Sequence, residues 1–151
     1  PPTSSDPKAI ALDQKLSETV ESLNPSLKKR ITKIGRLENG SRYLRAFDLF
    51  ILATYKENFA LTLLEAQLAG VPSLATNSGG SPDLVQPLAT GWLFLPGSTD
   101  SLRQTLLQAL SEQDRWSTFA SQAKTRVEAE FSFPSVLRSI DDRMGDLLAH
   151  R

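Results

Sequence analysis

Several residue types are scarce in this chain, and each scarcity excludes a class of function. The 151 residues contain no cysteine, one methionine and one histidine. Disulfide scaffolds and thiol chemistry are therefore excluded, and we expect a cytoplasmic location because disulfides belong to oxidising compartments. The single histidine, His150, lies next to the carboxyl end, where chains fray, and there is no Asp-x-Asp pair. The sequence therefore predicts no metal site.

Net charge and long apolar runs are also missing. The 17 basic residues equal the 17 acidic ones, which removes the electrostatic basis for binding nucleic acid or an anionic membrane surface. No apolar run approaches the roughly 20 residues that span a bilayer, so we expect no transmembrane segment. The alternative to a free cytoplasmic protein is a longer protein that associates peripherally with a membrane. Residues 1–7 show neither a signal peptide nor an initiator methionine, which indicates a processed or excised fragment.

The most informative stretch runs from Glu57 to Glu65, where two carboxylates bracket seven mostly apolar residues. Apolar runs typical of buried strands lie on both sides of it, over 49–54 and 71–76. The order strand, loop, helix, strand is that of a βαβ crossover in a parallel sheet. Because ligands bind at the carboxyl ends of such strands, Glu57 is predicted to lie at a binding edge.

Hydrophobic periodicity and turn residues predict the other elements of an α/β chain. Further strands are expected over 30–35 and 92–95. Helices are expected over 7–23 with Asp6 as N-cap, over 41–47, from 58, from a cap at Asp100 or Ser101, over 116–127, and from 133. The last helix is expected to bury a stripe formed by Val136, Leu137, Ile140, Met144, Leu147 and Leu148. The chain is therefore predicted to be a single domain over 1–151, with about four parallel strands and C-terminal helices.

The second glutamate of the motif is predicted to lie on an apolar helix face. On a helix that begins near Asn58, Glu65 shares a face with Leu61, Leu64 and Leu68. This face is predicted to be buried, and an ionised carboxylate there costs several kcal/mol unless it is paired or hydrogen-bonded. Ribose hydroxyls would supply the donors.

The first glutamate lies on the loop before the helix, where Glu57 would accept hydrogen bonds from sugar hydroxyls. The N–H groups of residues 58–61 at the helix start would bind phosphate. One segment could therefore bind the sugar, phosphate and ribose of a sugar nucleotide. The alternative is structural: an early glutamate can stabilise the helix dipole, and a buried one can pair with a backbone donor or an arginine.

Four segments carry a family resemblance. They are the strand before the motif, the motif, a double-glycine loop and the last strand, at residues 47–52, 57–72, 76–83 and 91–97. In this order they resemble the carboxyl-terminal, donor-binding half of the retaining GT-B glycosyltransferases of family four. The resemblance implies a Rossmann-like parallel sheet, incomplete here. It also implies transfer of a hexose-type sugar from a nucleoside diphosphate to an acceptor, with retention of configuration.

The resemblance also implies roles for single residues. Glu57 would be catalytic, because it would bind the transferred sugar and stabilise charge as the bond to phosphate breaks. Glu65 would bind the ribose hydroxyls, and the loop residues Arg36 and Leu37 would contact the nucleobase. The backbone N–H groups that would contact the sugar and diphosphate belong to Asn58, Phe59, Ala60 and Leu61. Catalysis would rest on positioning and electrostatics, without a metal or another cofactor. The expected partners are a nucleotide sugar and an acceptor-binding half or another chain.

The sequence departs from the family pattern in three ways. Ala60 stands where glycine is usual, and Asp83 where glutamate is usual. The family's donor half opens with a Gly-Arg loop and a Lys-Gly pair whose cations bind diphosphate, but no Lys-Gly follows Gly35-Arg36. By this register the chain lacks the first two strands and the acceptor-binding half. We therefore expect it to be inactive alone and marginally stable, unless its strands re-pair or it associates with another chain.

Two further functions are compatible with the motif. The chain could be a non-catalytic scaffold that keeps the motif as packing, or an epimerase-like module of the same GT-B design. Calorimetry with nucleotides and sugar nucleotides would separate these from a donor-binding role. The sequence does not identify the base, the sugar or the acceptor.

Overall fold

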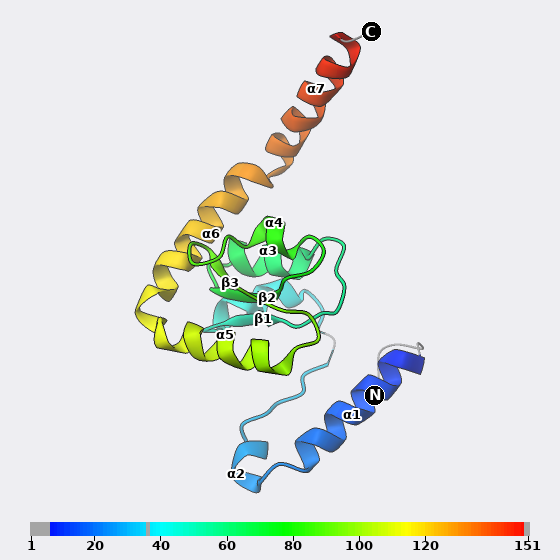
Figure 1. The fold of residues 1–151 in the computed structure, drawn as a ribbon, viewed down its shortest axis with the longest axis vertical. Helices are drawn as coiled ribbons and strands as arrows, with labels where there is room; N and C mark the ends of the chain where they lie inside the picture. Colours follow the sequence, from blue (N-terminus) through cyan, green and yellow to red (C-terminus); the bar gives the residue numbers. More distant parts are fainter. Residues whose placement is uncertain (1–6, 36, 150–151) are drawn as a thin grey trace. The chain divides into compact units, whose positions relative to one another are not determined.

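The computed structural model describes residues 7–35 and 37–149, and the chain divides into two compact units, Pro1–Gly40 and Ser41–Arg151. The sequence had indicated a single domain over 1–151. The sheet and the expected ligand-binding residues from Glu57 onward all lie in the second unit (Figure 1).

The first unit contains two helices, α1 (Pro7–Glu21) and α2 (Pro25–Lys28). The turn between them follows from Asn24-Pro25: Pro25 lies at the helix start, and the Asn24 side-chain oxygen accepts the N–H of Leu27 at 2.9 Å. The helix predicted over 7–23 is confirmed as far as Glu21, and its expected cap, Asp6, lies outside the described residues.

The prediction of a strand over 30–35 is wrong. Residues 31–35 pair with no strand of the described chain, and the side chains of Ile31 and Ile34 are 46% and 57% exposed. A short apolar segment becomes a strand only where a neighbouring strand supplies ladder hydrogen bonds, and no described strand does so here.

The second unit is built on a parallel sheet of three strands, β1 (Phe50–Leu52), β2 (Ser73–Thr76) and β3 (Gly91–Phe94), in the order β1-β2-β3. Phe50 pairs with Ser73, and Leu74 with Trp92. The predicted parallel α/β class is confirmed, although the described residues form three strands rather than about four.

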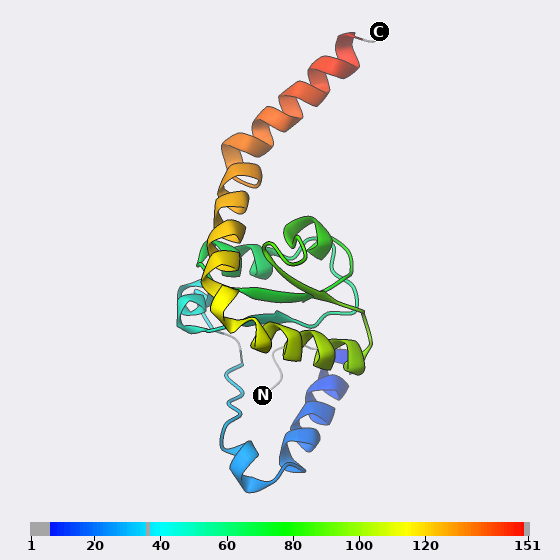
Figure 2. The same ribbon diagram turned by 60° about the vertical axis from the view of Figure 1, so that its left-hand side comes forward.

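Helical segments lie before, between and after these strands. They are η1 (Gly40–Ala46), α3 (Leu61–Leu68), α4 (Ser81–Leu84), α5 (Thr99–Ser111), η2 (Gln113–Arg115), α6 (Trp116–Glu130) and α7 (Phe133–Ala149). Helices α3 and α4 lie on one face of the sheet and α5 on the other (Figures 1 and 2). Helix α6 follows α5 and packs along α3.

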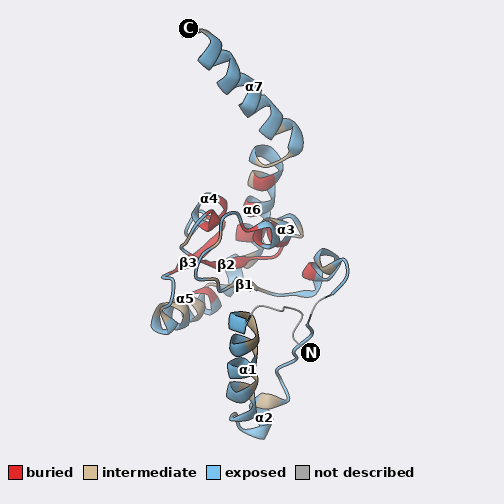
Figure 3. Ribbon diagram, turned by 90° about the vertical axis from the view of Figure 1, so that its right-hand side faces the viewer, coloured by how far each residue is buried: buried red, intermediate tan, exposed pale blue. Residues whose placement is uncertain are grey.

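Successive side chains of β2 point to opposite faces of the sheet, and each face has its own core cluster. Leu74 points into a cluster with Trp92 and Phe119, whereas Ala75 points into a cluster with Leu63 of α3. The Trp92 and Phe119 rings are tilted, with centroids 4.9 Å apart. Figure 3 shows the buried residues gathered on the strands and on the helices that cover them.

Two helix expectations need correction. Helix α5 begins at Thr99 and is capped by Ser98, whose hydroxyl accepts the N–H of Ser101 at 3.1 Å; the expected caps, Asp100 and Ser101, lie inside the helix. The stripe expected to be buried on α7 is exposed along its length (Figure 3), because no described element packs over it. None of the described helices is both long and apolar enough to cross a membrane.

Candidate functional site

The loops that follow β1 and β2 lie against each other at the carboxyl edge of the sheet. The Thr76 hydroxyl accepts the N–H of Thr54 and donates to the carbonyl of Leu52, both at 3.1 Å. The Ser78 hydroxyl donates to the Tyr55 carbonyl at 3.1 Å. These side-chain bonds fix the loop that contains Glu57 to the end of β2.

The double-glycine loop makes the closest contact with the motif. Gly79 has φ +56°, and a Cβ placed on it would lie 1.4 Å from the carbonyl oxygen of Glu57. A Cβ on Gly80 would lie 2.7 Å from the carbonyl oxygen of Asn58 and 3.2 Å from the Cα of Phe59. Residues 57–59 can therefore occupy their positions only because the facing residues lack side chains.

Helix α3 begins three residues later than predicted, at Leu61 rather than near Asn58. The carbonyl of Ala60 accepts the N–H groups of Leu63 and Leu64 at 3.0 and 3.1 Å, and the N–H of Leu61 donates to Phe59 at 3.0 Å. The N–H of Leu61 is therefore occupied, which corrects the expectation that it is free for phosphate.

Other N–H groups at the start of α3 are free. Among the described residues, no hydrogen bond engages the backbone N–H of Asn58, Phe59, Ala60 or Thr62. The Ala60 methyl group is buried in the core cluster that contains Leu63. Thr62 was not predicted as a ligand-binding residue, because the helix had been expected to begin earlier.

The two glutamates differ in exposure. Glu57 is half-buried, and Glu65 is exposed. Within the described chain neither carboxylate forms a hydrogen bond or an ion pair. Both are therefore available to a ligand.

The predicted burial of Glu65 is wrong, because α3 packs on its opposite side. Its buried residues are Leu63, Ala66 and Gln67, whereas Leu61 and Leu68 are 66% and 36% exposed. Gln67 donates from its side-chain nitrogen to the Leu84 carbonyl at 3.1 Å, which fixes the buried side. Leu61, Glu65 and Leu68 thus form one exposed face along the helix.

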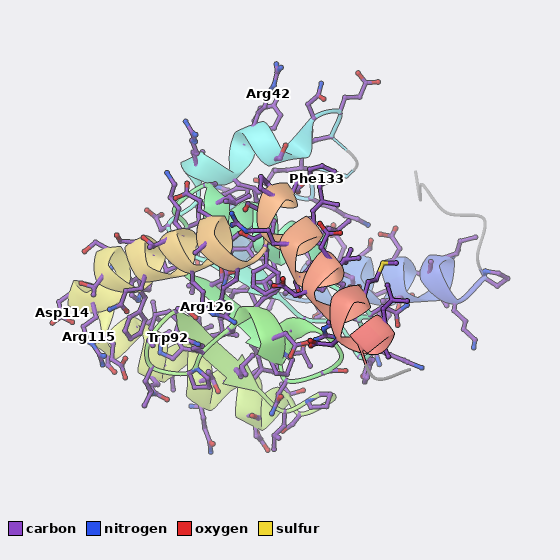
Figure 4. The ribbon with its side chains drawn as sticks, turned by 90° about the horizontal axis from the view of Figure 1, so that it is seen from above. Arg42, Trp92, Asp114, Arg115, Arg126 and Phe133 are labelled. Atoms are coloured by element: carbon purple, nitrogen blue, oxygen red, sulfur yellow. The ribbon has the colours of Figure 1, made fainter. Side chains whose placement is uncertain are left out.

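A hollow of about 560 Å³ lies at this exposed face. Helix η1 contributes Ser41, Arg42 and Arg45 to it, and the second half of α3 with the residue that follows contributes Glu65, Leu68 and Ala69. Figure 4 labels Arg42 on η1. Sequence reasoning missed both arginines; their only signal was a spacing of three residues on a predicted helix, which puts them on one side.

The remaining predicted site residues are Arg36 and Leu37. Leu37 is an exposed residue of the first unit. Arg36 and His150 lie outside the described residues, so their assignments stay predictions. The described residues contain no group of three or more side chains that could bind a metal ion, and metal independence likewise stays a prediction.

A family model for glycosyl transferases group 1 matches residues 12–126. The N-acetyl-alpha-D-glucosaminyl L-malate synthase of Bacillus anthracis is 29% identical over 125 residues, which cover 83% of this chain and 33% of that protein. A GDP-mannose-dependent monoacylated alpha-(1-6)-phosphatidylinositol monomannoside mannosyltransferase of Corynebacterium glutamicum is 31% identical over 124 residues, covering 76% and 32%. The chain thus spans about a third of the length of the curated relatives it matches.

Solved structures share the fold. HepE of Anabaena, solved in complex with UDP-glucose, superposes on this chain with a TM-score of 0.75 at 23% identity, covering 88% of this chain and 36% of that one. At this identity the likeness concerns the fold alone.

Proposed function

Because the chain belongs to the glycosyl transferases group 1 family, we propose that it binds the nucleotide-sugar donor of a retaining glycosyltransferase. The resemblance inferred from the sequence is thereby confirmed at the level of family and fold. One observation supports the proposal most directly: Gly79 and Gly80 let residues 57–59 pack against the end of β2, so that a carboxylate and free N–H groups lie together at the start of α3.

The spacing of these groups fits a nucleoside diphosphate sugar. The free N–H groups of Asn58, Ala60 and Thr62 would bind the diphosphate, where the helix dipole also favours negative charge. Glu65 lies three residues beyond Thr62, about 4.5 Å further along the helix axis. A ribose joined to the bound phosphate would therefore reach the Glu65 carboxylate, which would accept its hydroxyls.

Glu57, on the loop before the helix, would bind the transferred sugar on the other side of the diphosphate. As the bond between the sugar and phosphate breaks, its carboxylate would stabilise positive charge on the sugar, and the N–H groups would stabilise the leaving diphosphate. Both effects are electrostatic and require no protein nucleophile and no metal. The acceptor would be bound by an acceptor-binding half or by another chain, so we expect no transfer by this chain alone.

The names of two similar proteins indicate the ligand class. One relative is GDP-mannose-dependent, and one structural neighbour was solved with UDP-glucose. A scaffold role, in which the motif serves only as packing, is not favoured because Glu65 is exposed and Glu57 forms no described bond.

Isothermal titration calorimetry with UDP, GDP, UDP-glucose and GDP-mannose tests the proposal. We expect binding of at least one of them, and a loss of about tenfold or more in affinity for Glu65→Ala, because a hydrogen bond to a charged group contributes about 1.5–3 kcal/mol. Glu128→Ala, which removes an exposed carboxylate of α6, is the matched control and should leave affinity unchanged. The proposal is wrong if the unaltered chain binds no nucleotide or if both variants bind equally.

A further inference from the structure

A largely buried cation on α6 is not used by the proposed function. The side chain of Arg126, labelled in Figure 4, is 17% exposed, and a charge removed from water is costly unless it is paired and hydrogen-bonded. Its Nη1 donates to the Leu84 carbonyl at 3.0 Å, and its Nη2 lies 2.8 Å from Oε2 of Glu130. Its Cζ also lies 5.5 Å from the centroid of the Phe131 ring, a cation–π contact. Two of these contacts lead to the candidate site.

The contact with Leu84 leads to the double-glycine loop. Leu84 is the last residue of α4, a helix of four residues that begins at Ser81, directly after Gly80. A carbonyl at a helix end has no partner within the helix. The Leu84 carbonyl instead accepts one hydrogen bond from Arg126 and another from Gln67 of α3, at 3.1 Å. These two side-chain bonds hold the short helix, and with it the glycine loop, against α3 and α6.

The contact with Phe131 leads to the segment that lies on the glycine loop. Phe131 follows the end of α6, and its ring centroid lies 5.9 Å from that of Phe59, with the rings inclined at 45°. A Cβ on Gly80 would lie 3.2 Å from the Cα of Phe59, so the two residues are in close contact. Arg126 is therefore connected to both partners of this contact, to the glycine through α4 and to residues 57–59 through Phe131.

We propose that Arg126 is a positioning residue for the donor site, which holds the Gly79–Gly80 loop and residues 57–59 together so that the free N–H groups at the start of α3 keep their arrangement. The inference rests on the proposed donor-binding function, in which Arg126 touches no part of the donor. A guanidinium group suits this role because its planar fork can donate to Leu84 and Glu130 while a ring lies against it; an ammonium group is a single point charge.

The alternative is that Arg126 only stabilises the packing of α6, and calorimetric titration of the full chain with UDP and GDP, at a temperature where every variant is folded, distinguishes the two. For Arg126→Met we expect about tenfold weaker binding of the nucleotide that the unaltered chain binds, because residues connected to a site without touching the ligand can change its affinity by this order. Phe119→Leu is the control, since Phe119 is buried against Trp92 on the other face of the sheet. It should lower the melting temperature and leave the affinity unchanged.

A double-mutant cycle with Phe59→Leu tests the connection through Phe131. This variant removes the Phe59 ring and keeps its main-chain N–H group. If Arg126 acts through the ring contact, the double variant Arg126→Met/Phe59→Leu should lose less binding free energy than the sum of the two single losses. Additive losses would overturn the proposal. If Arg126→Met does not fold, Arg126→Lys replaces it in both measurements, with an expected loss of about threefold because the charge is kept and the planar fork is lost.

The outcomes separate this inference from the proposed function. Unchanged affinity in the Arg126 variant, or a loss of the same size in Phe119→Leu, would overturn the positioning role. If Glu65→Ala still loses UDP or GDP binding in that case, the donor-binding function stands and the role of Arg126 alone is wrong. A chain that binds no nucleotide overturns both.

Discussion

Gly79, which is not among the proposed ligand-binding residues, determines how residues 57–59 pack against the end of β2. Its φ of +56° belongs to the left-handed region, and its missing Cβ leaves room for the carbonyl of Glu57. A side chain there would meet two separate obstacles: the backbone conformation and a main-chain oxygen that cannot rotate away.

We expect Gly79→Ala to lower the free energy of unfolding by about 3 kcal/mol or more, because the left-handed conformation costs about 1–2 kcal/mol and the clash adds to it. Denaturant unfolding measures this change. Gly145→Ala is the control: its Cβ would meet nothing within 4 Å in α7, and the substitution should stabilise the helix by up to about 1 kcal/mol. Equal effects at the two positions would contradict the assignment of Gly79.

Among the candidate site residues, those with an informative spacing along the chain could be predicted from the sequence. Glu57 and Glu65 stand out because two carboxylates bracket an apolar segment. The buried side of α3 was not predictable, because leucines occur all around this helix and α6, a segment far along the chain, determines which side is covered. Arg42 and Arg45 have no sequence relation to the motif, and only the folding of η1 beside α3 brings them to Glu65.

At the scale of elements, a strand was predictable from an apolar run where another strand lies beside it. The apolar runs at β1, β2 and β3 became strands because each has a parallel neighbour. The run at 30–35 has no described strand to pair with, and the stripe on α7 has the right period but no described element over it. Periodicity therefore predicts a face and does not show that the face is covered.

Removing residues 134–151 should change the free energy of unfolding by less than about 1 kcal/mol, since none of the α7 side chains described is buried.

By contrast, Phe119→Ala should lower the free energy of unfolding by about 3–5 kcal/mol, because Phe119 is buried against Trp92. Urea unfolding of the shortened chain and of the Phe119 variant checks both values. A large loss on removal of α7 would show that its apolar stripe is covered in solution.

At the scale of the whole molecule, the sheet is small, and its edge at β1 is open within the described chain. No described strand pairs with the outer side of β1, where Ile51 is 41% exposed. Three short strands, of which β1 and β3 are both edge strands, give a modest core, and unpaired apolar edges favour association between chains.

We therefore expect the chain to melt below about 60 °C as a monomer, or to associate as its concentration rises. Calorimetric melting combined with light scattering distinguishes the two outcomes. Ile51→Lys should reduce association without lowering the melting temperature, because a charged edge residue disfavours strand addition. A monodisperse monomer that melts well above 60 °C would contradict this expectation.

The packing of the double-glycine loop on residues 57–59 has a consequence for how this molecule tolerates substitution. If main-chain N–H groups bind the diphosphate, the side chains of Asn58, Phe59 and Thr62 can vary without removing a single ligand contact. The positions that tolerate no side chain are instead Gly79 and Gly80, because a Cβ there would collide with the main chain of residues 57–59. In saturation mutagenesis, the most sensitive positions around the phosphate would therefore be residues that make no contact with the donor.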